Sequence, residues 1–159
     1  MMLPRKYSIN QQTGFTLLEV LVSLVIISIG LLGLAGLQAT GLKNNLSASH
    51  RSQATQLSYD IADRMRSNKA SINNYLTSFM APTVAGKQNG CLTAAGCSSS
   101  QMAQHDLYEW NLSLINLLPS GEGVISLAAG NYTVMVNWDD NRDGTVDEND
   151  PNFQMSFQP

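Results

Sequence analysis

Basic residues are scarce in this chain of 159 residues, which has 9 lysines and arginines against 12 aspartates and glutamates. The formal net charge is -3, so the chain has no basic stripe that could neutralise a phosphate backbone. We therefore expect no nucleic acid among its partners. Charged residues of both signs together make up only 13% of the chain. The length is that of one domain.

Catalytic patterns are also missing from the sequence. It has no recognisable set of nucleophile, base and orienting residue, no glycine-rich phosphate loop and no metal-hydrolase spacing. We therefore expect that the protein is not an enzyme. Its only cysteines are Cys91 and Cys97. In an exported domain such a pair is expected to form a disulfide. A redox motif is not expected, because such motifs prefer a two-residue spacing between the cysteines.

Proline is absent between Pro4 and Pro82, and this stretch begins with a long apolar run over residues 15–37. At about 1.5 Å per residue, such a run is long enough to cross a hydrocarbon core of about 30 Å. Apolar residues then continue at three- and four-residue steps, which predicts one long helix over 15–68. These later apolar positions are Ala54, Leu57, Ile61 and Met65.

Four glycines interrupt the first half of this predicted helix, at Gly30, Gly33, Gly36 and Gly41. Small residues of this kind allow close packing of helices within membranes. Each glycine also costs about 1 kcal/mol of helix stability relative to alanine, so the stretch could equally be one that bends or unwinds. The sequence leaves both interpretations open.

The apolar run contains one charge, Glu19, and is preceded by Arg5 and Lys6. Basic residues on this side predict that the N-terminus stays in the cytoplasm. A carboxylate near the end of a membrane helix can reach the interface with water. Acidic residues within membranes are, however, by default functional and need a partner.

The segment Gly14-Phe15-Thr16-Leu17-Leu18-Glu19-Val20, with its short basic leader, resembles the class III signal of type IV pilins and type II secretion pseudopilins. In that family a prepilin peptidase cuts after the glycine and methylates the new N-terminal phenylalanine. The resemblance implies that Gly14 and Phe15 flank the cut. It also implies that Glu19 pairs with the N-terminal amine of Phe15 in a neighbouring subunit.

Two further segments, residues 28–38 and 56–68, are similar to the PilV family of minor type IV pilins. This resemblance implies a minor pilin that helps to prime the pilus within a tip complex and supports twitching motility and adhesion. The subunit would sit in the inner membrane with a cytoplasmic N-terminus and a periplasmic head, and then move into the extracellular pilus. Its partners would be prepilin peptidase, the major pilin, other minor pilins and the inner-membrane assembly platform.

Two other functions stay open on the sequence. The first is a pseudopilin of a type II secretion machine, which shares the same N-terminal signal. The second is a calcium-dependent binding module tethered by a signal anchor that is not cleaved. Only a pilin-like chain would lose 14 residues and gain a methyl group.

The predicted organisation has four parts and an α+β pilin fold. Residues 1–14 form a cleaved leader, 15–37 the transmembrane and filament-core helix, 38–70 the periplasmic half of the stem, and 71–159 the globular head. The head is expected to contain one further helix and a small antiparallel sheet.

Within the head, apolar residues at helical spacing predict a helix over 101–118, with Trp110 in the core. Three strands follow, and the sequence places them at 124–128, 132–138 and 153–157. His50 and His105 are expected on polar faces.

Residues 139–150 fit the twelve-residue pattern of a calcium loop, with Gly144 at the sharp turn. Six of the chain's twelve acids lie here against one base, Arg142, and a bound Ca²⁺ would relieve their repulsion. The final position is aspartate instead of the usual glutamate, and a solvated acidic connection between strands is the alternative. The predicted oxygen ligands are Asp139, Asn141, Asp143, Thr145, Asp147 and Asp150.

Overall fold

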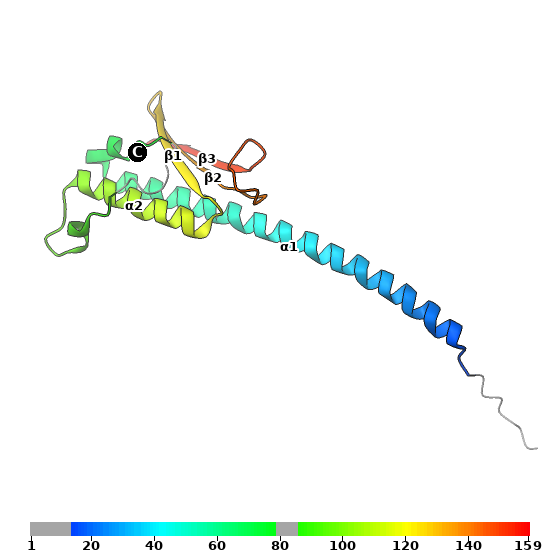
Figure 1. Cartoon of the computed structure of the whole chain (residues 1–159). Helices are drawn as coiled ribbons and strands as arrows, with labels where there is room; N and C mark the ends of the chain where they lie inside the picture. Colours follow the sequence, from blue (N-terminus) through cyan, green and yellow to red (C-terminus); the bar gives the residue numbers. More distant parts are fainter. Residues whose placement is uncertain (1–13, 79–85) are drawn as a thin grey trace, which may run out of the picture. The chain divides into compact units, whose positions relative to one another are not determined.

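The computed structural model describes residues 14–78 and 86–159. Most of the predicted leader, including Arg5 and Lys6, therefore lies outside the described residues. The chain divides into two compact units, residues 1–43 and 44–159. We call the second unit the head, and Figure 1 shows the order of its elements.

The first helix, α1, spans Leu17–Ser67 and is long and apolar enough to cross a membrane. It begins where the Thr16 hydroxyl accepts a hydrogen bond from the Glu19 amide at 3.3 Å. Every residue of the first unit that the structure describes, 14–43, is exposed. An apolar surface of this size needs lipid or protein around it. The predicted helix over 15–68 is confirmed to within two residues at each end.

The four glycines of the stem all lie inside α1 without breaking it. A methyl group added at any of them would have no other atom within 4 Å. The glycines therefore leave small patches on an exposed helix surface. Both interpretations of these glycines remain predictions.

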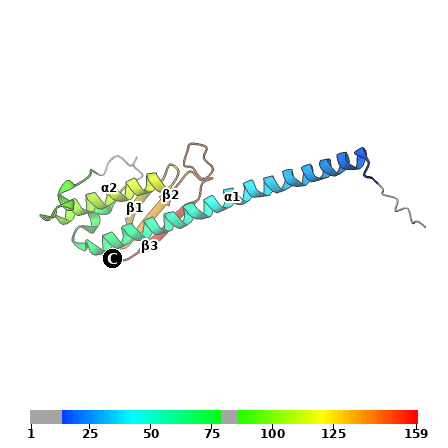
Figure 2. The same ribbon diagram turned by 90° about the horizontal axis from the view of Figure 1, so that it is seen from below.

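The head combines the second half of α1 with a second helix and three strands. Helix α2 spans Ser99–Leu117, and the strands are β1 (Glu122–Ala128), β2 (Asn131–Asn137) and β3 (Asn152–Phe157). Short 3₁₀ helices, η1 (Lys69–Tyr75) and η2 (Asn89–Leu92), connect α1 to α2. The strands form one antiparallel sheet in the order β1-β2-β3, and Figure 2 shows both helices beside it. The predicted α+β pilin fold is confirmed.

Helix α2 begins with a capping box, which explains its sharp start. The Ser98 hydroxyl accepts a hydrogen bond from the Gln101 amide at 3.3 Å, and the Gln101 side chain accepts one from the Ser98 amide at 3.0 Å. These two bonds satisfy backbone groups that a helix end otherwise leaves unpaired.

Trp110 of α2 lies at the centre of the head and is 1% exposed, as the sequence predicts. Its indole Nε1 donates a hydrogen bond of 3.0 Å to the backbone oxygen of Leu57 in α1. On the other side its ring packs against Gly123 of β1, where no side chain separates the two. The indole thus joins both helices to the sheet. The remaining core includes Ala54, Ile61, Met65, Leu114, Ile125, Val134, Val136 and Trp138.

The two histidines differ from the sequence prediction. His50 is only 9% exposed and His105 only 5%, so neither lies on an open polar face. Tertiary contacts explain this difference. Asp140 of the 139–150 loop contacts His50, and residues packed around α2 bury His105. Helical periodicity alone does not show either contact.

Gly123→Ala tests the close approach of β1 to the indole. A methyl group there would overlap the Trp110 ring, so we expect the free energy of unfolding to fall by about 1–3 kcal/mol. Denaturant unfolding of the full chain in detergent measures this change. Gly90→Ala is the control, because its added methyl group would meet only a backbone oxygen at 3.8 Å. Equal stability of the two variants would contradict the packing described here.

Candidate functional site

The N-terminal end of α1 presents the residues that the sequence assigns to processing. Gly14 and Phe15 precede the helix, and Phe15 is 84% exposed. Glu19 lies in the first helical turn, four residues after Phe15. Phe15 and Glu19 both line the same shallow groove along α1. A peptide bond in such a position is open to a peptidase, and the carboxylate is open to a neighbouring chain.

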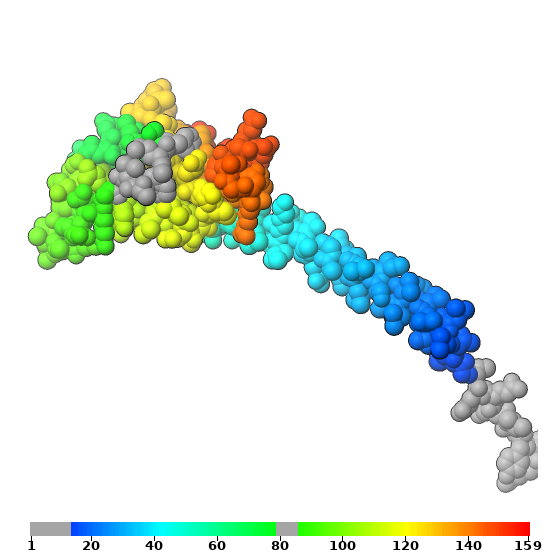
Figure 3. Space-filling model, in the orientation of Figure 1, coloured from blue at the N-terminus to red at the C-terminus, as the bar shows by residue number. Residues whose placement is uncertain are grey.

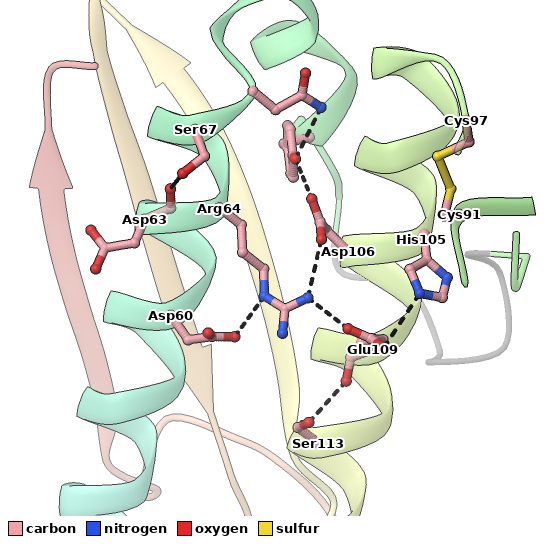
Figure 4. A network of polar contacts seen from close by, with 12 residues as sticks. Asp60, Asp63, Arg64, Ser67, Cys91, Cys97, His105, Asp106, Glu109 and Ser113 are labelled. Atoms are coloured by element: carbon pink, nitrogen blue, oxygen red, sulfur yellow. Dashed lines mark hydrogen bonds and ion pairs between the residues drawn. A yellow bond between two sulfur atoms is a disulfide. The ribbon is translucent and has the colours of Figure 1, made fainter. Parts of the chain in front are cut away.

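Arg64 of α1 is the centre of an ionic network that joins the two helices of the head (Figure 4). Its Nη1 lies 3.0 Å from Asp106 Oδ1 and 2.7 Å from Glu109 Oε2, both on α2. Its Nε lies 2.9 Å from Asp60 Oδ2 in the preceding turn of α1. One guanidinium therefore contacts three carboxylates from two helices, which the several N–H donors of arginine allow.

Asp106 is the most buried carboxylate of this network. Its other oxygen, Oδ2, accepts a hydrogen bond of 2.5 Å from the Tyr75 hydroxyl, which in turn accepts one from Asn68. Burial, and then the bond to Asp106, raises the pKa of Tyr75 well above its usual range. The tyrosine therefore stays protonated and donates, which fixes the end of α1 and η1 against α2.

The charges of the network reinforce one another. Burial alone would lower the pKa of Arg64, but its bonds with Glu109 and Asp106 raise it above the ordinary value. The Arg64 guanidinium in turn lowers the pKa of Glu109. His105 adds a contact of 3.4 Å between its Nε2 and Glu109 Oε1. The group is therefore a structural clamp between the helices.

The sequence does not predict this clamp, although two residue pairs give a partial signal for it. Asp60 and Arg64 are four apart on α1, and Asp106 and Glu109 are three apart on α2, so each pair shares a helix face. Nothing in the sequence states that these two faces meet. The pairing needs the packing of α1 on α2.

The acidic loop over 139–150 connects β2 to β3, as predicted, and Figure 3 shows it in orange at the surface of the head. Both oxygens of Asp139 accept backbone hydrogen bonds, from Asp143 at 3.2 Å and Gly144 at 2.9 Å. The two oxygens of Asp150 accept from Asp140 at 3.0 Å and Asp147 at 3.1 Å. The carboxylates of Asp139 and Asp150, the first and last residues of the pattern, thus point into the loop.

The middle of the loop is more open. Asp143 Oδ1 accepts from the hydroxyl and the amide of Thr145, and these bonds, with one from Asn141, lower the pKa of Asp143. Gly144 has a φ of +95°, which fits the sharp turn of the pattern. Among the residues that the structure describes, no three His, Cys, Asp or Glu side chains come close enough together to hold a metal. Calcium therefore stays a prediction.

A contact that the sequence does not predict ties the acidic loop to α1. Asp140 Oδ1 lies 3.3 Å from His50 Nδ1 and accepts a hydrogen bond of 3.1 Å from Trp138 Nε1. Burial alone would raise the pKa of Asp140, but hydrogen bonds with Ser47, Trp138 and His50 lower it. The start of the loop is therefore anchored on the helix.

Two family models match this chain. Residues 36–108 match the Tt1218-like family, described as type IV pilin Tt1218, and residues 9–35 match the prokaryotic N-terminal methylation motif. These matches support a type IV pilin. No curated protein and no solved structure matches the chain.

The matched methylation motif indicates how the N-terminal end of α1 is processed. The methylation motif implies processing by prepilin peptidase and assembly into pili, and it contains Gly14, Phe15 and Glu19. The motif and the apolar helix together fit membrane anchoring. The family match over 36–108 also includes Arg64 and Asp106, so both sides of the helix clamp lie within the matched region.

The head contains the disulfide that the sequence predicts. Cys91 and Cys97 are joined with their Cα atoms 4.8 Å apart, and together they are all the cysteines of the chain. The bond closes a short loop between η2 and the start of α2. By chain entropy a loop of this length contributes about 2 kcal/mol.

Glu109→Gln tests the clamp through pH. The folded state lowers the pKa of Glu109, so its contribution to stability is present above the ordinary glutamate pKa of about 4.3 and is lost as the pH falls further. We expect the variant to lose stability less steeply than the wild type below about pH 4.5. Denaturant unfolding of the full chain in detergent between about pH 3 and 7 measures the slopes.

The matched control is Glu148→Gln, which makes the same change of charge in an exposed turn of the acidic loop. This control should keep the wild-type slope below pH 4.5. If Glu109→Gln also kept the wild-type slope, the ion pair with Arg64 would not contribute to stability.

Proposed function

We propose that this type IV pilin is a minor pilin of the PilV kind, cut after Gly14 and later incorporated into a type IV pilus. The observation that carries this proposal is the arrangement at the start of α1. An exposed Gly14-Phe15 bond is followed, four residues after Phe15, by Glu19, the one charge of the apolar run over 15–37.

Cleavage at this bond would create a new ammonium group on Phe15. When stems stack in a filament, this charge leaves water and needs a compensating anion. Glu19 lines the same groove as Phe15, so on an axially shifted neighbouring subunit it would supply that anion. The exposed apolar surface of residues 14–43 would first contact lipid and then the stems of other pilins.

The proposed function requires one orientation of the chain in the inner membrane. Arg5 and Lys6 hold the N-terminus in the cytoplasm, α1 spans the inner membrane once, and the head lies in the periplasm until the subunit enters the extracellular pilus. The proposed partners are prepilin peptidase, the major pilin, other minor pilins and the inner-membrane assembly platform. The subunit acts structurally and not as an enzyme.

Within the pilus we propose a role in priming and in a tip complex, with support of twitching motility and adhesion. The PilV-like segment 28–38 lies on α1, and the segment 56–68 covers the end of α1 at Ser67 and carries Arg64. A pseudopilin of type II secretion is the competing assignment. Co-purification with long-pilus subunits favours the minor pilin, whereas co-purification with secretion components favours the pseudopilin.

Intact mass of the membrane-extracted protein tests the processing step. We expect the wild type to lose its first 14 residues and gain one methyl group, and we expect Gly14→Ala to stay at full length. Gly41→Ala is the control, since it makes the same change within α1 and should be processed normally. A wild-type protein that keeps its N-terminus would instead support a tethered binding module.

Glu19→Gln in the same host separates cleavage from assembly. This variant should be cut like the wild type but should be lost from sheared pili, because the new amine at Phe15 then has no counter-charge. Wild-type amounts of the variant in pili would contradict the proposed charge pair.

We also propose that residues 139–150 bind one Ca²⁺ through the predicted ligands. The support is the spacing of the pattern, the left-handed turn at Gly144, and the inward placement of Asp139 and Asp150. Binding would require Asp143 and Asp147 to turn towards these two carboxylates. It would reduce the repulsion among six acids.

Calcium titration of the full chain in detergent, followed by calorimetry and melting, tests this proposal. Saturation near one ion per chain should raise the melting temperature, and Asp143→Ala should abolish both effects. Glu148→Gln is the matched control, because it removes a charge of the loop that is not a predicted ligand. Absence of heat and of any melting shift at millimolar calcium would reduce the loop to a polar connection.

A further inference from the structure

Strand β3 is an edge of the sheet, and its sequence lacks the usual protection of an edge. The strand pairs with β2 on one side, and no described backbone group pairs with it on the other. Natural edge strands are commonly protected by lysine, proline or a bulge. Residues 152–157 (NFQMSF) contain neither a charge nor a proline, and their register with β2 is continuous.

The contacts of β1, the opposite edge strand, show which backbone groups of β3 face away from the sheet. Thr77 donates its amide to the Ile125 oxygen at 3.0 Å, and the Ile125 amide donates to the Thr77 hydroxyl at 3.1 Å. Ile125 therefore directs both backbone groups away from β2. In antiparallel pairs such residues alternate along the strand.

The alternation continues through the registers of the sheet. Because Ile125 faces away from β2, its neighbour Val124 exchanges backbone hydrogen bonds with Met135 of β2. The next residue of β2, Val134, therefore directs its backbone groups to β3, where its partner is Met155. The backbone groups of β3 that face β2 belong to Phe153, Met155 and Phe157. Those that face outward belong to Asn152, Gln154 and Ser156, and the side chains of these three residues are exposed as well.

The two edges of the sheet thus differ. On β1, Thr77 bonds the outward groups of the central residue Ile125, whereas on β3 the described residues leave all the outward groups, three amides and three carbonyl oxygens, without a protein partner. Phe153 and Met155 pack against the core but remain only half-buried. An added strand would both bond the free backbone groups and cover these side chains.

Charge at one end of β3 indicates the chemistry of the partner. The acidic loop ends at Asp150, two residues before the strand, and carries six acids against one arginine. At the other end Arg66 lies 4.7 Å above the ring of Phe157. A partner strand with basic residues near Asn152 would therefore complement the loop, whereas basic residues at the Phe157 end would meet Arg66.

We propose that the free edge of β3 binds an extended segment of another protein by antiparallel strand addition. The segment alternates apolar and polar residues and carries lysine or arginine at its C-terminal end, which lies beside the acidic loop. This inference goes beyond the proposed function, and only the exclusion of a second copy rests on the membrane anchoring proposed there.

A second copy of this chain is a poorer occupant of the edge. Antiparallel pairing of β3 with itself requires a two-fold axis normal to the sheet. Because α1 packs on the face of the sheet, that axis would reverse the direction of α1 in the second copy. Two chains anchored through α1 in one membrane share one direction.

The test uses the full chain in detergent and a short synthetic peptide. Valine and threonine alternate over about six residues of this peptide, and two lysines follow at its C-terminal end. Hydrogen exchange should show the amides of Asn152, Gln154 and Ser156 to be fast in the free protein and slowed at least about tenfold at saturating peptide. Slow exchange of these amides without peptide would overturn the proposal.

Gln154→Pro removes one outward amide without removing a bond to β2, since the Gln154 amide faces away from that strand. We expect it to weaken peptide binding about tenfold, whereas the matched variant Gln154→Thr should bind like the wild type. A peptide with its lysines at the N-terminal end should bind more weakly, and this difference should shrink at high salt. Equal binding by Gln154→Pro, with an unchanged melting temperature, would overturn strand addition.

If Gln154→Pro fails to fold, the wild-type chain with a modified peptide still decides the matter. Methyl groups on the peptide amides that face β3 should abolish binding, because they remove the donors and block the approach of the strands. Retained binding of this peptide would show that it contacts another surface.

Discussion

The indole of Trp110 is the contact on which the head depends, because it touches every layer at once. Its nitrogen is bonded to the backbone of α1 at Leu57, and its ring fills the space that Gly123 leaves open on β1. A larger residue at 123 would clash with the ring, and a smaller one at 110 would leave a cavity between the helices and the sheet. The second half of α1 therefore belongs to a folded domain, although its first half has the composition of a membrane helix.

Polar contacts fix the ends of the head part of α1 where the apolar core stops. Near the C-terminal end of α1, Arg64 holds α2 through Asp106 and Glu109. At the other end, His50 contacts Asp140 and so holds the first turn of the acidic loop. Because these pairs are partly exposed, they set the position of the elements more than they add to stability. Both contacts link residues far apart in the sequence, so they form only when the head is folded.

The described residues offer separate surfaces for separate tasks. The exposed start of α1, with Phe15 and Glu19, is suited to processing and to contact with other stems. The free edge of β3 and the adjoining acidic loop lie on the head. Subunits of one filament could thus share the same assembly chemistry and differ in what their heads bind.

The sequence by itself determined the stem, the class of fold and the processing signal. A largely apolar run of 23 residues and the spacing of Gly14, Phe15 and Glu19 are local features, and the alternation over 132–138 and 153–157 depends on neighbouring residues alone. The Cys91–Cys97 disulfide is local as well, because a short loop brings the two sulfurs together.

Only the tertiary structure decided which faces meet. The burial of His50 and His105, the clamp around Arg64 and the free groups of β3 depend on how α1, α2 and the sheet pack, and these partners lie far apart along the chain. Periodicity identifies an apolar face but not its partner, and it treats a polar residue as exposed. A histidine or aspartate that finds a distant partner is therefore misplaced by sequence reasoning, and long-range packing alone corrects it.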